Sequence, residues 1–161
     1  MFKFGTIGGF KASNNPRVTC ATDVVNGQAF SIVTDGIQET ATAFANSNAV
    51  RDASEVWVVF NVIDRPELLN SDDFVIPAGS PIRAFKLNDI IGLTVELSMD
   101  VITGAVVPDV NAILIPDDDM NWRIAVSPAD DGDYPLALQV MGQTTFGGSG
   151  VVAKIVETTI T

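Results

Sequence analysis

The stretch LTVELSMDV, residues 93–101, decides the fold class, because its apolar and polar residues alternate without interruption. Leucine, valine or methionine occupies each odd position, and threonine, glutamate, serine or aspartate occupies each even position. This alternation is that of a β-strand, whose successive side chains point to opposite faces of a sheet. The stretch is therefore predicted to be a strand with one face on the core and the other in water.

Segments on both sides of this stretch have strand character as well. The runs at 17–25 and 28–34 meet at Asn26-Gly27, a dipeptide that tolerates the positive φ of a tight turn, so a hairpin is predicted there. Residues 56–60 are apolar at every position, which predicts a central strand covered on both faces. Further strands are predicted at 112–115, 122–127, 136–146 and 150–160.

The stretch DDFVIPAGSPIRAFKL, residues 72–87, breaks a strand and restarts it at once. Pro77 stops ladder pairing, Gly79 permits a positive φ, and Pro81 fixes the exit of the chain. A phosphate-binding loop would need a following helix, and the serine of a hydrolase elbow would need flanking glycines, whereas Ser80 precedes Pro81. The segment is predicted to be a structural corner at a sheet edge.

Only residues 37–50 carry apolar side chains at helical spacing, and the threonines and asparagines among them limit this segment to a short helix or a loop. The remaining pattern predicts an all-β fold, a compact sandwich or partly open barrel of short antiparallel strands with at most one short helix. A length of 161 residues, with 47% apolar, suits one core. We therefore expect an extended N-terminal arm at 1–16 and a single β domain at 17–161.

The charge of the chain is strongly acidic and unevenly distributed. Nine basic and 20 acidic residues give a net charge of −11, which opposes binding to the phosphate backbone of nucleic acids. The first 22 residues nevertheless carry +3, and the remaining six basic and 20 acidic residues give −14. This basic, phenylalanine-containing segment is typical of an arm that binds a partner, although a disordered or self-packed terminus would have the same composition. The candidate partner-binding residues are Phe2, Lys3, Phe4, Phe10, Lys11 and Arg17.

The inventory of reactive side chains argues against an enzyme. The chain has no histidine, which removes the usual catalytic triads and most zinc sites. Cys20 is its one cysteine, so no intrachain disulfide forms, and its place in a strand pattern predicts a small buried hydrophobe. We predict no catalytic residue, no cofactor and no metal. With no signal peptide or membrane span visible, we expect a soluble protein made in a cytoplasm.

Acidic residues gather at three predicted turns, at 72–73, 117–119 and 130–133. Paired carboxylates serve as acid and base in glycosidases, and carboxylate oxygens bind Ca²⁺. None of the clusters has the alternating ligands of an EF-hand, and solvated turns have the same composition. An enzyme or a metal-dependent stabiliser is therefore the least favoured function.

Four segments taken in order resemble a pattern found in the head decoration (cement) proteins of tailed bacteriophages, which are small β-rich proteins on the outside of the capsid. The segments are VWVVFNVIDRPEL at 56–68, FVIPAGSPIRAFKL at 74–87, VPDVNAILIP at 107–116 and LQVMGQTTFGGSGVVAKIV at 138–156. The likeness covers most of residues 17–157, and it departs from the pattern at Pro108, where a glycine is usual.

The resemblance implies a structural protein that binds the major capsid protein at the capsid exterior and stabilises the head. It also implies synthesis in the host bacterial cytoplasm and a homo-oligomer, with a trimer expected. Such a protein needs no catalytic group and adheres through contact area and the avidity of many lattice sites. The basic arm is the part expected to contact the capsid.

An alternative is a carbohydrate- or receptor-binding β-sandwich, such as a module of a phage fibre. Modules of this kind stack sugars on exposed aromatic rings, for which Trp57, Trp122 and Tyr134 are the candidates. The apolar flanks of Trp57 indicate a core position. Trp122, beside an acidic turn, is therefore the better candidate for this function.

Overall fold

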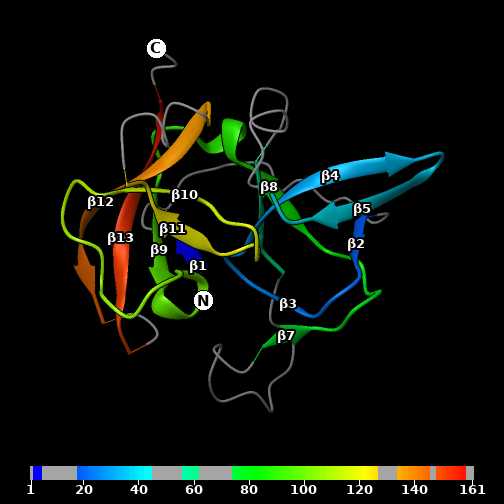
Figure 1. Cartoon of the computed structure of the whole chain (residues 1–161), viewed down its shortest axis with the longest axis horizontal. Coiled ribbons are helices and arrows are strands. Elements are labelled where there is room, and N and C mark those ends of the chain that lie inside the picture. The colour runs from blue at the N-terminus through cyan, green and yellow to red at the C-terminus, as the bar shows by residue number, and fades with distance from the viewer. Residues whose placement is uncertain are drawn as a thin grey trace.

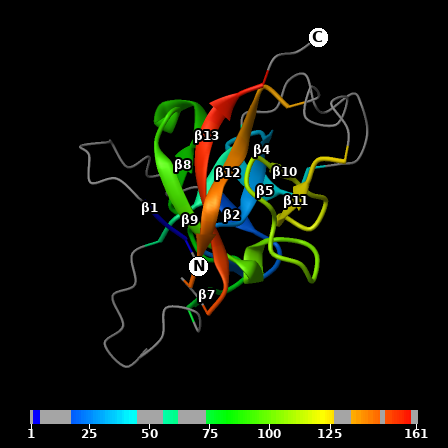
Figure 2. The same ribbon diagram turned by 90° about the vertical axis from the view of Figure 1, so that its left-hand side faces the viewer.

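The computed structural model describes residues 2–4, 18–44, 56–61, 74–126, 134–145 and 148–158, with the backbone alone described for 2–4. Within these residues the fold is all-β, as predicted, with three sheets and two short 3₁₀ turns (Figures 1 and 2). The described residues include no helix that could cross a membrane. The strands are β1 (Phe2–Phe4), β2 (Val18–Cys20), β3 (Val24–Val25), β4 (Ala29–Asp35), β5 (Gln38–Thr42), β6 (Trp57–Val59), β7 (Val75–Ile76), β8 (Ala84–Lys86), β9 (Thr94–Ser98), β10 (Ile113–Pro116), β11 (Trp122–Ile124), β12 (Leu136–Thr144) and β13 (Gly150–Glu157), and the turns are η2 (Leu87–Ile90) and η3 (Met99–Val101).

The larger sheet has the strand order β1-β9-β13-β12-β10-β11, and every pair in it is antiparallel. Its longest strands, β12 and β13, form a hairpin whose register shifts between Val140 and Gly142. Such a bulge bends a strand and increases its twist, which fits the curl of this sheet in Figure 1. The strands predicted at 112–115, 122–127, 136–146 and 150–160 are confirmed as β10 to β13, although β11 already ends at Ile124. Residues 127, 146, 159 and 160 lie outside the described part of the chain.

A five-stranded sheet has the order β2-β5-β4-β6-β8, with β2 parallel to β5 and the other pairs antiparallel. The predicted central strand is confirmed, because β6 lies between β4 and β8. Val56 and Val58 pack into one core cluster, whereas Trp57 and Val59 pack into or against another. This sheet therefore separates two cores, and β6 is covered on both faces.

The two cores divide the buried side chains between the sheets. The first core joins the larger sheet to one face of the five-stranded sheet and includes Ala29, Val58, Phe85, Val95, Leu97, Trp122, Leu138 and Ile155. The second core lies on the other face and includes Val18, Cys20, Val24, Phe30, Ala41, Val59, Ile76, Ile82, Ala84 and Met120. Alternation along β4, β6 and β8 sends neighbouring residues to different cores.

The loop between β10 and β11 connects the two cores. Met120 packs into the second core and Trp122 into the first. The Trp122 Nε1 donates a hydrogen bond to the Gly27 carbonyl at 2.8 Å, and the Ala29 amide donates to the Met120 carbonyl at 2.7 Å. We call these two bonds the inter-sheet junction, because they fix the β10–β11 loop of the larger sheet against the start of β4.

The hairpin predicted at Asn26-Gly27 is wrong, although a turn forms there. Gly27 has a φ of 99°, and the Gln28 amide donates to the Val25 carbonyl at 3.4 Å. The flanking strands do not pair with each other, since β3 pairs with β7 and β4 pairs with β5 and β6. The Asn26 side chain instead exchanges hydrogen bonds with the backbone of Asn61 at 2.9 and 2.7 Å. The turn therefore passes the chain from one sheet to another.

The short helix or loop predicted at 37–50 is also wrong in the described part, since residues 38–42 form β5. This strand pairs antiparallel with β4 from Ser31↔Thr42 to Asp35↔Gln38. The connecting turn has Gly36 at a φ of 63°, which suits the tight turns of hairpins. Pairing with β4 outweighs the weak helical spacing of residues that include β-branched threonines. Residues 45–50 lie outside the described part of the chain.

The stretch 93–101 is a strand only as far as Ser98, after which it turns through η3. Val95, Leu97 and Val101 are buried, so the prediction of the inner face is confirmed for them. Ser98, predicted to face water, is 0% exposed, so the prediction of the outer face is wrong at this position. The strand is shorter than predicted because the turn brings Ile102 beside Trp122 in a parallel bridge. Contact with β11 therefore sets the end of β9.

The corner predicted at 72–87 is confirmed in its described part, residues 74–87, whereas residues 72 and 73 lie outside the described residues. The Ser80 amide donates to the Pro77 carbonyl at 3.0 Å, and Gly79 lies between them with a φ of 76°. The Gly79 amide donates to the Cys20 carbonyl at 2.9 Å. The corner thus covers the edge of β2 that β5 leaves open, and the chain continues into β8.

We expect Trp122→Phe to lower the free energy of unfolding by about 2–4 kcal/mol, because it removes buried volume and leaves the Gly27 carbonyl without its indole donor. Urea denaturation measures this change. Trp57→Phe is the control, since Trp57 is only half-buried and should lose about 1 kcal/mol or less. Equal losses in the two variants would contradict a special role for the junction.

Gly79→Ala should lower the free energy of unfolding by about 1 kcal/mol, because alanine is strained at a φ of 76°. Gly142→Ala is a matched control, since open space surrounds both glycines and Gly142 has no positive φ. The Gly142 variant should stay within about 0.5 kcal/mol of the parent protein. Thermal unfolding of both variants checks the difference, and a neutral Gly79 variant would refute the corner geometry.

Candidate functional site

The predicted N-terminal arm begins as a strand of its own subunit. Strand β1 pairs antiparallel with β9 at the edge of the larger sheet, and Lys3 lies opposite Glu96 in the register. The side chains of residues 2–4 are not described, and Phe10, Lys11 and Arg17 lie outside the described residues. The partner-binding role of the six arm residues therefore stays a prediction, while the backbone of residues 2–4 covers the edge of β9.

The aromatic side chains do not form an exposed sugar platform. Trp122 is 0% exposed and Tyr134 is 2% exposed, so the prediction of an accessible Trp122 is wrong. Tyr134 packs edge-on against Phe44 with ring centroids 5.8 Å apart. Trp57 is half-buried against the second core. The Trp122 indole nitrogen donates its hydrogen bond within the inter-sheet junction, to the Gly27 carbonyl. Because this polar atom has a partner inside the protein, the whole side chain can be buried although it follows an acidic turn.

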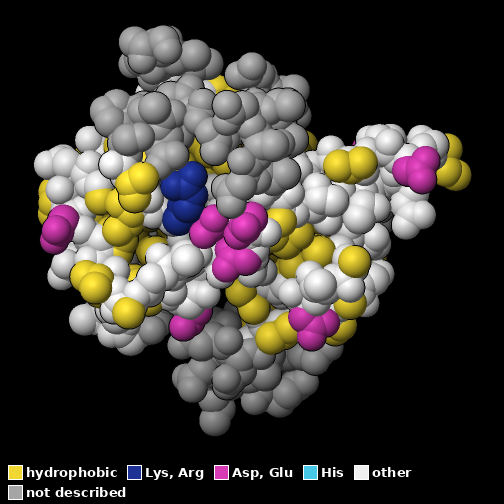
Figure 3. Space-filling view, in the orientation of Figure 1, with side chains coloured by type: hydrophobic (Ala, Val, Ile, Leu, Met, Phe, Trp, Pro, Cys, Tyr) yellow, Lys and Arg dark blue, Asp and Glu magenta, His cyan; other side chains and the backbone are white. Residues whose placement is uncertain are grey.

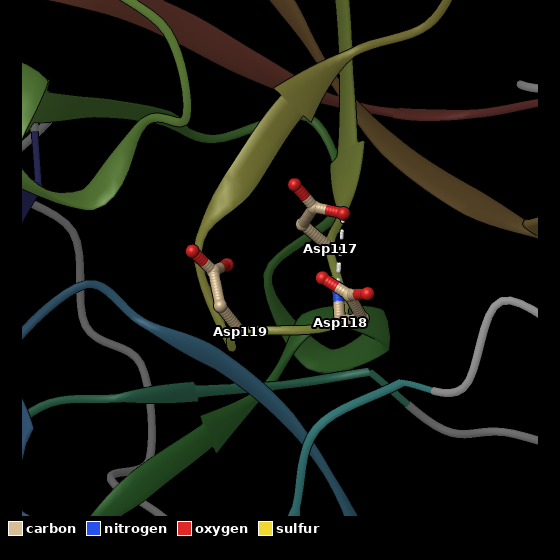
Figure 4. Close-up of side chains that lie close together, drawn as sticks. All are labelled: Asp117, Asp118 and Asp119. Carbon is tan, nitrogen blue, oxygen red and sulfur yellow. Dashed lines mark hydrogen bonds between the residues drawn. The ribbon is translucent and has the colours of Figure 1, made fainter.

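The acidic turn Asp117–Asp119 brings three carboxylates together between β10 and β11 (Figure 4). One oxygen of each carboxylate lies within 4.8 Å of the other two. The Asp117 side chain is only 12% exposed, whereas Asp118 and Asp119 are exposed. Hard oxygen ligands in such an arrangement are the kind that Ca²⁺ uses.

Asp117 is held by groups of its own hairpin. Its Oδ1 accepts a hydrogen bond from the Asp118 amide at 3.0 Å, which Figure 4 shows as a dashed line. The same oxygen lies 3.7 Å from the Arg123 Nε, in a salt bridge across the start of β11. A cation is therefore already present beside the best-buried carboxylate of the cluster.

Asp119 is the first member of a polar chain that leads to the inter-sheet junction. Its two oxygens accept hydrogen bonds from the amide and the side-chain nitrogen of Asn121 at 2.9 and 2.8 Å. The Asn121 Oδ1 accepts from Gln28 Nε2 at 3.2 Å, and the Gln28 Oε1 accepts from the Val25 amide at 2.9 Å. The acidic turn thus orients the side chains that hold the two sheets together.

These partners make the acidic turn a structural element. At least three of the six carboxylate oxygens already accept hydrogen bonds from the loop, namely Asp117 Oδ1 and both oxygens of Asp119. Short acidic side chains that bond their own loop amides stabilise turns without any ion. We therefore assign these carboxylates a role in the geometry of the loop.

Cys20 is buried, as predicted. It is 5% exposed on β2 and packs into the second core, with its Sγ 3.4 Å from the Thr22 Oγ1. A buried thiol in an apolar cluster behaves as a small hydrophobe. Burial of this side chain offers no route to a substrate.

The sequence predictions missed the exposed apolar side chains of the β4–β5 hairpin. Ile37 is 87% exposed and Val33 is 53% exposed. Figure 3 shows this hairpin as a projection from the body of the protein, with hydrophobic and acidic side chains at its end. The Asp35-Gly36 dipeptide in VTDGIQET was the turn signal that could have identified it, but the apolar residues at helical spacing that follow favoured a helix or loop instead. The hairpin is the candidate interaction surface.

No protein-family model, curated protein or solved structure matches this chain. Only the placement of its own residues therefore bears on its function. Among the described residues, the acidic cluster and the thiol have structural partners, whereas the end of the hairpin presents apolar side chains to solvent.

Asp119→Ala should lower the free energy of unfolding by about 1 kcal/mol, because it removes both hydrogen bonds that orient Asn121. Asp89→Ala, in an exposed position of η2, should have little effect. Since the loop amides and Arg123 already engage the carboxylates, EDTA or added Ca²⁺ should leave the melting temperature of the parent protein unchanged. A Ca²⁺-dependent rise in melting temperature would contradict the structural assignment.

Proposed function

We propose that this protein is a structural, non-enzymatic protein that decorates the exterior of a phage capsid, binds its major capsid protein and stabilises the head. The observation that carries the proposal is the projecting β4–β5 hairpin with its exposed Val33 and Ile37. An apolar end on a projecting element is typical of a protein that attaches to another surface. The likeness of four strand-and-turn segments to head decoration proteins supplies the kind of partner.

The chemistry of the chain supports a role in adhesion. It contains no histidine. Its cysteine is buried, and the acidic turn serves its own loop. Stability comes from two apolar cores and the junction between them, so folding requires no disulfide and suits the reducing cytoplasm of a bacterial host.

The dimensions of the chain also suit multivalent attachment. A standard protein interface takes about 800 Å² from each partner, and the chain exposes 8429 Å². One face can therefore contact the capsid while another contacts neighbouring copies. Repetition over a lattice raises the total binding strength through effective concentration, even where each contact is small. A homo-oligomer, with a trimer expected, is part of this proposal.

Binding to expanded capsids tests the proposal. Particles are assembled from the major capsid protein encoded in the same genome, mixed with the purified chain and sedimented. We expect saturable co-sedimentation and a higher melting temperature of the decorated particles, because binding stabilises the assembled state. A wild-type chain that stays in the supernatant at all concentrations would refute the proposed function.

The contribution of the arm is tested with Lys11→Glu combined with Arg17→Glu, which should weaken binding and leave the melting temperature of the free chain unchanged. Reversing two charges of an electrostatic contact lowers the association rate and the affinity. Deletion of residues 1–16 is a less specific variant, because it also removes β1 and uncovers the edge of β9. Unchanged binding by the charge-reversed variant would exclude the arm from the interface.

A further inference from the structure

The β4–β5 hairpin has a buried base and an exposed outer half. Phe30 and Ala41 at its base pack into the second core, whereas residues 33–38 are exposed. Figure 1 shows the end of the hairpin projecting away from the six-stranded sheet, and the space-filling view in Figure 3 shows the same projection. Pairing of Asp35 with Gln38 closes the end with a tight turn. The outer half is therefore held in place by the base and surrounded by solvent on the face that Figure 3 displays.

The apolar side chains of the outer half have no evident role in folding. Ile37 lies in the turn after Gly36 and is 87% exposed, and Val33 on β4 is 53% exposed. Ile32, one residue earlier, already packs against the second core and so anchors the strand. Tight turns of this kind need glycine at the positive φ and do not need an apolar residue beside it. These two side chains are available to a partner.

One backbone edge of the outer half is open among the described strands. Strand β6 pairs with β4 only at Ala29 and Phe30, and β2 pairs with the opposite edge of the hairpin at 39–41. Beyond Phe30, no described strand pairs with the β6 side of β4. An open edge lets the backbone of a partner approach closely.

The charge around the hairpin identifies the kind of partner. Between residues 18 and 44 the sequence has three acidic side chains, Asp23, Asp35 and Glu39, and no lysine or arginine. A second copy of the hairpin would bring like charges together, which disfavours self-association through this element. A partner with lysine or arginine around an apolar depression would complement both the charge and the exposed side chains.

We propose that the end of the β4–β5 hairpin docks into an apolar depression bordered by basic side chains on the capsid surface. Val33 and Ile37 fill the depression, and Asp35 and Glu39 meet the basic side chains at its rim. The identity of the partner rests on the proposed function, whereas the docking element rests on the exposure and charge of this hairpin. Because the base of the hairpin is packed, little conformational freedom remains to be lost on docking.

The test compares variants in co-sedimentation with expanded particles. Val33→Ser combined with Ile37→Ser should weaken binding at least about tenfold, since buried apolar anchors dominate interface affinity. Asp35→Lys should also weaken binding and reduce its sensitivity to salt. Val106→Ser is the matched control, because Val106 is 76% exposed on a different loop. All variants should keep the melting temperature of the parent protein.

The possible results separate the docking element from the function. Weakened binding by the hairpin variants alone, with normal binding by the Val106 variant, supports the inference. If the hairpin variants bind as strongly as the parent protein, the inference is overturned and the proposed function stands. If the parent protein binds no particle, both are overturned. Sedimentation equilibrium of the free chain gives one more possible result. If the parent protein is a dimer and the Val33/Ile37 variant is a monomer, the hairpin binds a second copy of the chain, and the inference is overturned.

Discussion

The hydrogen bond from the Trp122 indole to the Gly27 carbonyl is the interaction on which the arrangement of the two cores depends. Trp122 fills the first core, and the preceding Met120 fills the second while its carbonyl accepts from the Ala29 amide. A buried polar group without a hydrogen-bond partner lowers the stability of the fold. Few other placements of the Trp122 indole and the Gly27 carbonyl are therefore compatible with a packed core. The junction therefore fixes where β10 and β11 meet the start of β4.

The acidic turn supports the same junction. Asp119 orients Asn121, and Asn121 bonds Gln28 beside Gly27, so a carboxylate at the surface helps to position the buried contact. The turn therefore resembles a catalytic or metal site in composition while its side chains stabilise a loop. Acidic side chains in such turns contribute to the net charge of −11 of the chain.

The β4–β5 hairpin contributes to the second core at its base and carries the proposed docking surface at its end. Its base contributes Phe30 and Ala41 to the second core, and its end exposes Val33 and Ile37. A folded element that is held at its base presents these side chains at a low entropic cost. The sequence analysis did not identify this candidate site. Apolar residues at helical spacing follow Gly36 and favoured a helix or loop, whereas residues 38–42 form a strand because they pair with β4. It identified the basic arm instead, whose side chains remain to be tested in binding.

The sequence by itself determined the all-β class, the doubly covered strand β6, the corner at Gly79 and the burial of Cys20. These features follow from short-range patterns, since side-chain alternation and the need for a positive φ are properties of neighbouring residues. Only the tertiary structure decided that β3 pairs with β7, that residues 38–42 form a strand, and that Trp122 is buried. The β3–β7 pairing and the burial of Trp122 depend on partners distant in the sequence, as Trp122 and Gly27 are, 95 residues apart, whereas the strand at 38–42 depends on its pairing with the neighbouring β4. Local preference cannot choose among such partners, and the packing of both cores together with the pairing of buried polar groups does.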